Sequence, residues 1–284
     1  MPDIPYDASR DALYSPQLRP TVFTTDAHYE LPALCAELSR LAYIHFEDGG
    51  AEQASLEAAL ALVGFNGFVS FIDTPTGTQG YGAWRSADNL ALLAFRGTEP
   101  NSLTDLGTDL NVSMTAWPLS SGHAHAGFAR AALSVFEPVK QWLSTNSAAR
   151  KQLVLTGHSL GAAIATLLAS AVTPDKLITI GSPRIGDSAF AETLDGIDIT
   201  RFVDCCDVVT ELPPELGGYV HVGLSTYIDR SGALQPQADA EFILSDQLAA
   251  RADFVREYAW KTGNNVVRDL ADHAPINYVR SLVG

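Results

Sequence analysis

The segment LVLTGHSLGAAIATLLA, residues 153–169, constrains the fold of this chain more than any other. It opens with the apolar pattern of a buried strand and closes with a helix-like run rich in small side chains. Ser159 lies between them, with a glycine two positions away on each side. Glycines at both places indicate a bend with no room for a Cβ atom. The pattern is typical of a nucleophile elbow, a strained strand-to-helix turn that holds a serine oxygen clear of the sheet.

Strand and helix patterns alternate after this segment. Residues 176–186 read as a strand and a loop, residues 188–196 as a helix, and residues 199–209 as a strand that leaves into a loop. This alternation predicts an α/β fold with a mostly parallel central sheet and helices on both faces. The sequence has no repeat, linker or composition break, so we expect a single domain over residues 1–284. Residues 1–30 contain four prolines and are expected to form an extended arm.

Composition makes several classes of protein improbable. The net charge of −15 disfavours binding to nucleic acid or to anionic membranes. Cys35, Cys205 and Cys206 are odd in number and two are adjacent, a poor layout for disulfides or for structural zinc. No apolar stretch is long enough to span a membrane. The first residues do not read as a signal peptide, so export would require a leader already removed.

A serine hydroxyl needs a base to take its proton and an acid to orient that base. In this type of fold the order along the chain is Ser, then Asp or Glu, then His. Two histidines follow Ser159. His221 lies in the strand-like pattern YVHVG and is expected to be a core histidine. His273 lies in DLADHAPINYV, in a loop before the last helix, and is the favoured base.

Two carboxylates compete for the role of the acid. Asp204 and Asp207 both follow the strand pattern ITRFV, and catalytic groups gather at the carboxyl ends of parallel strands. Spacing alone does not separate them, and one of them is expected to be a turn or surface carboxylate. A simpler interpretation of the whole motif is an ordinary tight turn without chemistry. The apolar strand before Ser159 and the alanine-rich helix after it favour the elbow.

Six segments, taken in this order, resemble the class 3 lipases, a family also called fungal-lipase-like. They are LLAFRGTE (92–99), HAHAGF (123–128), TGHSLGAAIA (156–165), GSPRIGDSAFA (181–191), DVVTELPP (207–214) and DHAPINYV (272–279). The resemblance extends from about residue 31 to residue 283. It implies an α/β-hydrolase-type fold and the roles of its site residues. These are the nucleophile Ser159, the acid Asp207, the base His273, and the oxyanion-hole residues Thr98 and Leu160.

The resemblance also assigns the segment after Thr98. Residues 99–108 correspond to a mobile lid, with Leu103 and Leu106 as its clear apolar contacts, although an ordinary surface loop explains them equally well. Asp109 corresponds to the carboxylate that holds the side chain of the oxyanion residue. Secreted members of the family carry a set of disulfides that this sequence does not show. The sequence therefore does not decide whether the protein is secreted or cytoplasmic.

The resemblance implies a triacylglycerol lipase, a serine hydrolase that forms an acyl-enzyme on Ser159 and needs no cofactor or metal. Its partner would be an ester or lipid substrate, met at a lipid–water interface, and not nucleic acid or an integral membrane site. A carboxylesterase for soluble esters and a phospholipase A1 would use the same three residues. A non-catalytic binding protein of α/β-hydrolase type is a more distant alternative, since a fold does not fix a function.

Overall fold

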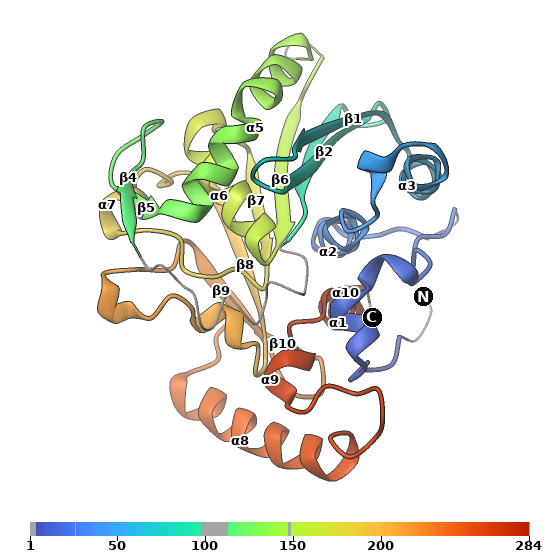
Figure 1. Cartoon of the computed structure of the whole chain (residues 1–284), viewed down its shortest axis with the longest axis vertical. Helices are drawn as coiled ribbons and strands as arrows, with labels where there is room; N and C mark the ends of the chain where they lie inside the picture. Colours follow the sequence, from blue (N-terminus) through green and yellow to red (C-terminus); the bar gives the residue numbers. More distant parts are fainter. Residues whose placement is uncertain (1–3, 26, 98–112, 147–148, 284) are drawn as a thin grey trace.

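The computed structural model describes residues 4–25, 27–97, 113–146 and 149–283. Within these ranges an eight-stranded sheet forms the centre of the molecule, in the order β1-β2-β3-β6-β7-β8-β9-β10 (Figure 1). Neighbouring strands from β3 to β9 run parallel, whereas β1, β2 and β10 pair in antiparallel fashion. The strands are β1 (Phe65–Asp73), β2 (Thr78–Arg85), β3 (Leu90–Phe95), β6 (Gln152–His158), β7 (Lys176–Ile180), β8 (Asp198–Asp204), β9 (Leu224–Ile228) and β10 (Leu234–Gln235).

Helices cover both faces of this sheet, as the alternation of patterns predicts (Figure 1). Helices α5 (Ala126–Thr145) and α6 (Leu160–Val172) pack on one face. Helices α2 (Leu31–Leu41), α3 (Gly50–Leu62) and α10 (Pro275–Val283) contribute to the core on the other. The other elements are α1 (Arg10–Tyr14), α7 (Ser188–Glu192), α8 (Ala240–Glu257), α9 (Arg268–Ala271), and the small hairpin of β4 (Met114–Ala116) and β5 (His123–His125).

Strand β3 shows why the apolar runs of the sequence form the centre of the sheet. All six residues of LALLAF are buried. Alternate side chains point to opposite faces of a strand. Accordingly, Leu93 and Phe95 enter the core beside α5 and α6, while Leu92 and Ala94 enter the core beside α2 and α10. A strand buried on both faces needs apolar residues at every position, so its sequence is continuous rather than alternating.

Two elements follow β8, and one expected strand does not form. Strands β9 and β10 form a hairpin, and helix α8 begins after Asp239, whose side chain accepts from the N–H of Phe242. Helix α5 continues through Pro138. The strand expected around His221 is wrong, because Val220 makes only an isolated bridge with Gly186 and His221 follows in a loop.

The N-terminal segment is only partly extended. It contains α1 and a short 3-10 helix, Pro16–Leu18, where an extended arm was expected. Part of its backbone bonds within the segment, and three of its carbonyl groups accept from a side chain of α2. Within the described ranges, no helix combines the length and the apolar character that crossing a membrane requires.

A buried ion pair on α2 holds this N-terminal segment in place. Arg40 donates to both carboxylate oxygens of Glu37, at 2.7 and 2.8 Å, and both side chains are essentially inaccessible to solvent. The guanidinium also donates to the backbone carbonyl oxygens of Pro16, Arg19 and Pro20. Glu37 in turn accepts from the hydroxyl of Thr21 and the N–H of Val22. The pair therefore satisfies three carbonyl groups and one N–H group of residues 16–22 from inside the fold.

Replacing Arg40 by methionine should lower the free energy of unfolding by about 3–5 kcal/mol, because Glu37 is left buried without a counter-charge. Urea denaturation measures this loss. The matched control is Arg256→Met, which removes an exposed partner of Asp253 and should cost less than about 1 kcal/mol. Equal losses in the two variants would contradict the structural role of the buried pair.

Candidate active site

Ser159 lies at the junction of β6 and α6 in a backbone conformation that side chains rarely adopt. Its φ is 59° and its ψ is −127°. A Cβ atom on Gly157 would lie 2.3 Å from the carbonyl group of Gly161, and one on Gly161 would lie 2.0 Å from the carbonyl oxygen of Phe95. The two glycines therefore allow the turn to close against β3. This is the crowding that the spacing of the glycines predicts.

The structure brings Ser159, His273 and Asp207 into one hydrogen-bonded line. The Nε2 atom of His273 lies 3.0 Å from the Ser159 hydroxyl oxygen, and its Nδ1 atom lies 2.8 Å from Oδ2 of Asp207. All three residues are buried. A carboxylate can only accept, so Nδ1 carries the proton and Nε2 is left free to accept from the serine. His221 is not part of this line, because it forms a hydrogen bond with the backbone of Thr210, and burial and nearby arginines lower its pKa to about 3.

Further donors hold the carboxylate of Asp207 in place. Oδ1 accepts from the N–H of Val209 at 2.9 Å, and Oδ2 accepts from the hydroxyl of Tyr278 at 2.6 Å. Together with His273, these donors hold the Asp207 carboxylate in one orientation.

Asp204 has the opposite surroundings. Its backbone N–H donates to the Tyr278 hydroxyl, but its buried side chain faces other acidic groups. Burial, and then the carboxylate of Asp272, raise the pKa of Asp204 well above its usual range. A carboxyl group kept neutral in this way is a poor partner for an imidazolium. The two carboxylates that spacing could not separate are thus distinguished by tertiary contacts.

His158, which precedes the serine, supports the backbone of His273. Its Nε2 atom lies 2.9 Å from the carbonyl oxygen of His273, and its Nδ1 atom lies 2.8 Å from the hydroxyl of Tyr43. A carbonyl can only accept, so Nε2 donates and Nδ1 accepts from the tyrosine. Burial, and then the nearby His273, hold the pKa of His158 well below its usual range. The ring is therefore neutral and fixed in one tautomer.

The candidate oxyanion-hole residues are described only in part. Leu160 begins α6, and the first N–H groups of a helix have no acceptor within the helix. Gly97 lies against the elbow, since a Cβ on it would be 3.0 Å from the Cβ of Ser159. The expected first oxyanion residue Thr98 lies outside the described residues. The expected lid, residues 99–108 with Leu103 and Leu106, and the supporting Asp109 also lie outside them.

Two tyrosines that contribute to this site could not be identified from sequence patterns. Tyr278 and Tyr43 reach it from α10 and from the turn after α2, far from Ser159 along the chain. Both residues stand in otherwise apolar surroundings that read as core positions. His158 belongs to the elbow motif itself, but only its hydrogen bond to His273 shows what it contacts.

Comparisons with known proteins find lipases among the proteins that this chain resembles. Residues 92–217 match the family described as lipase (class 3). A lipase from Rhizopus niveus is 32% identical over 187 residues, which cover 59% of this chain and 46% of that protein. The secreted mono- and diacylglycerol lipase 1 from Fusarium solani is 31% identical over 170 residues, covering 56% of this chain and 50% of that protein. The chain thus spans about half the length of these curated relatives.

A solved structure shares the architecture over most of the chain. The crystal structure of a lipase from Rhizopus microsporus var. chinensis superposes with a TM-score of 0.58 at 24% identity. The match covers 80% of this chain and 84% of that one. At this identity the likeness shows the fold alone.

Replacing each of the two carboxylates by asparagine should separate their roles. Asp207→Asn should lower kcat for a soluble p-nitrophenyl ester by about ten-thousandfold, because an amide favours the wrong tautomer of His273. Asp204→Asn should leave kcat near that of the wild type, because burial and Asp272 already disfavour the charged form of Asp204 and a neutral amide has a similar shape to a neutral carboxyl group. Steady-state kinetics of both purified variants measures the contrast. A larger loss in Asp204→Asn than in Asp207→Asn would show that the wrong carboxylate has been assigned.

Proposed function

We propose that this chain, which resembles class 3 lipases in part of its sequence and fungal lipases in its α/β-hydrolase fold, is a serine hydrolase that cleaves the carboxylic esters of acylglycerols. One observation carries the proposal, namely the line of hydrogen bonds from Ser159 through His273 to Asp207. The family match ends at residue 217, so His273 enters the proposal from the geometry and not from the match. A binding protein has no need for all three groups in this arrangement.

The proposed reaction begins at the Ser159 hydroxyl. Nε2 of His273 takes its proton while the serine oxygen attacks the ester carbonyl. Asp207 keeps Nδ1 protonated and stabilises the imidazolium that forms. The imidazolium then protonates the departing alcohol, leaving an acyl group on Ser159. Water, activated by the same imidazole, hydrolyses this acyl-enzyme and restores the serine.

The negative charge of the tetrahedral intermediate needs its own donors. We assign this role to the N–H groups of Leu160 and Thr98, of which the first lies at the positive end of α6. Such donors are held in place before the reaction, so they cost no reorganisation as the charge develops. Loss of one of them typically lowers the rate by about a hundred- to a thousandfold.

His158 and Tyr278 would act through the groups that they hold. The neutral ring of His158 fixes the backbone of His273, so the imidazole stays within reach of Ser159. Tyr278 donates to the same carboxylate oxygen that accepts from His273, and this limits how Asp207 can rotate. Small errors in position matter, because a displacement of about 1 Å can cost roughly a hundredfold in rate.

The names of the relatives support acylglycerols as the substrate class. One is a lipase and the other a secreted mono- and diacylglycerol lipase. A soluble-ester carboxylesterase and a phospholipase A1 would share the same three groups and differ in the acyl pocket. In our proposal residues 99–108 act as the lid that admits substrate at a lipid–water interface.

The initial rate of tributyrin hydrolysis, measured through the solubility limit, tests this proposal. We expect the rate to rise sharply once droplets appear, because an interface would then open the lid. Ser159→Ala should show no turnover on either side of the limit and serves as the control. Smooth saturation below the limit would identify a soluble-ester carboxylesterase instead. Faster hydrolysis of phosphatidylcholine than of tributyrin droplets would identify a phospholipase A1, and no hydrolysis of any ester would overturn the proposal.

A further inference from the structure

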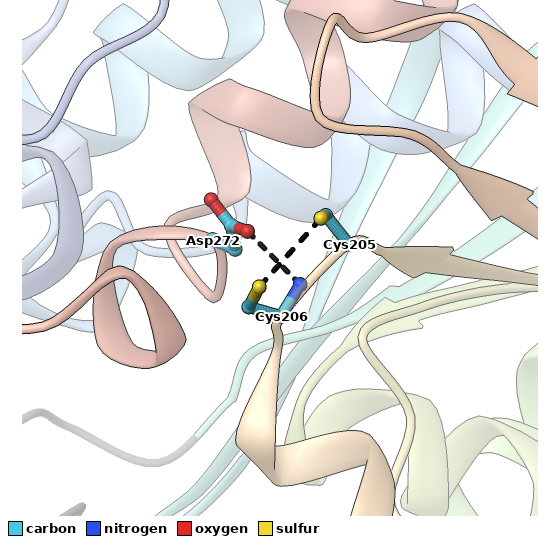
Figure 2. Close-up of side chains that lie close together, drawn as sticks. All are labelled: Cys205, Cys206 and Asp272. Carbon is cyan, nitrogen blue, oxygen red and sulfur yellow. Dashed lines mark hydrogen bonds between the residues drawn. The ribbon is translucent and has the colours of Figure 1, made fainter. Parts of the chain in front are cut away.

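Cys205 and Cys206 form a pair of adjacent buried thiols beside the proposed acid. Their sulfur atoms lie 3.6 Å apart, and both residues are almost inaccessible to solvent (Figure 2). They follow β8 and immediately precede Asp207. The reaction proposed above uses neither thiol.

A metal site is a poor explanation for this cluster. Asp272 lies close enough to both sulfur atoms to complete a group of three potential ligands. Its oxygens are already engaged, because they accept from the Tyr6 hydroxyl, from Nε of Arg268 and from the backbone N–H of Cys206. In Figure 2 the dashed line from the carboxylate reaches the nitrogen of Cys206 and not its sulfur. The ion pair with Arg268 also neutralises the negative charge of Asp272, which would otherwise attract a metal ion.

The pair occupies the middle of a turn that is connected to both partners of Ser159. The N–H of Asp207 donates to the carbonyl oxygen of Asp204 at 2.8 Å, so Cys205 and Cys206 are the two central residues of a β-turn. The last residue of this turn is the proposed acid. The N–H of Cys206 donates to Asp272 at 3.0 Å, and Asp272 immediately precedes His273.

We propose that Cys205 and Cys206 are an oxidation site, at which a peroxide forms a vicinal disulfide that withdraws Asp207 from His273. The proposal concerns control of the activity proposed above and so rests on that function. In the balanced step two S–H bonds and the O–O bond of hydrogen peroxide break. One S–S bond forms, and two molecules of water leave. The thiols are oxidised and the peroxide is reduced.

Ring closure must disturb the turn. The sulfur atoms would have to approach by roughly 1.5 Å to reach bonding distance. The new ring would contain the Cys205–Cys206 peptide group, whose N–H is the one that donates to Asp272. Reorienting this peptide therefore weakens the hydrogen bond to Asp272 and shifts Asp207, the next residue along the chain.

The same geometry makes the bond reversible. Consecutive Cα atoms are about 3.8 Å apart across a trans peptide, which is below the usual separation for a disulfide. A disulfide strained in this way is easily reduced and belongs to the labile class.

The surroundings of the pair slow its oxidation. The Cys205 thiol contacts the carboxylate of Asp246 on α8 and accepts from the hydroxyl of Tyr227. Its hydrogen bond with Cys206, and then its burial, raise the pKa of the Cys205 thiol. The thiolate is the form that reacts, so we expect the disulfide to form slowly, with peroxide as well as with air.

The test uses the full chain carrying Cys35→Ser, which leaves the pair as its only thiols. The protein is treated with hydrogen peroxide, quenched with catalase, denatured and alkylated with iodoacetamide. Mass spectrometry should find a peptide that is lighter by two hydrogens and not alkylated at Cys205 or Cys206. In parallel, kcat for a soluble p-nitrophenyl ester should fall by about tenfold or more, by the positional argument above, and return on addition of dithiothreitol.

Single-thiol variants are the controls. Cys205→Ser and Cys206→Ser, each in the Cys35→Ser background, cannot form the bond. The same peroxide treatment should therefore leave the kcat of each variant unchanged. If these variants fail to fold, the correlation of mass, kcat and recovery in the two-thiol protein still decides.

Three results would overturn the proposal. One is absence of the disulfide in the folded protein, and another is an unchanged kcat once the bond has formed completely. The third is absence of ester hydrolysis before oxidation, which would refute the proposed function and hence the control of its acid. In that case the mass measurement would still report separately whether the bond forms.

Discussion

The turn at Ser159 is the constraint on which the rest of the site depends. A positive φ at a serine is costly and persists only where the surroundings enforce it. Here β6 and α6 meet so closely that a Cβ atom on Gly157 would collide with the backbone of α6, and one on Gly161 with the backbone of β3. This crowding leaves the serine side chain facing His273 rather than packing in the core. His158, the residue before Ser159, also forms a hydrogen bond with the backbone carbonyl group of His273 and so fixes its position.

Buried polar groups around this turn are matched to distinct electrostatic roles. Asp207 is surrounded by donors, which suits a carboxylate that must stay ionised. Asp204 and Asp272 lie near one another, and the resulting repulsion is relieved by neutralising Asp204 and by pairing Asp272 with Arg268. His158 remains neutral beside a ring that must gain a proton during the proposed reaction. Neighbouring groups, and not burial alone, therefore give buried residues of one chemical type different roles.

Much of this arrangement could be predicted from the sequence, because local patterns determine it. The elbow shows in the spacing of two glycines about Ser159, and the parallel sheet shows in apolar runs such as β3. The choice between Asp204 and Asp207 could not be made from spacing, because both follow the same strand. It depends on the contact between Asp207 and His273, which lie 66 residues apart in the sequence.

Two expectations about the fold were wrong, namely the strand around His221 and the fully extended N-terminal arm. YVHVG has an apolar, strand-like pattern, but the Val220 backbone finds only Gly186 as a bridge partner, so no strand forms around His221. In the N-terminal segment prolines suggested extension, yet Ser9 caps a short helix over Arg10–Tyr14. The first case depended on contacts between distant parts of the chain, which a local pattern does not contain. The second depended on a local capping signal at Ser9, which the expectation from the prolines missed.

The most direct measurement of the central claim is reaction of the native protein with an organophosphonate, followed by mass mapping of the modified residue. A serine activated by His273 should take up one phosphonyl group per chain, at Ser159, and the reaction should slow by orders of magnitude in His273→Ala. An unreactive Ser159, or labelling at the same rate in both proteins, would contradict the account and favour a non-catalytic binding protein.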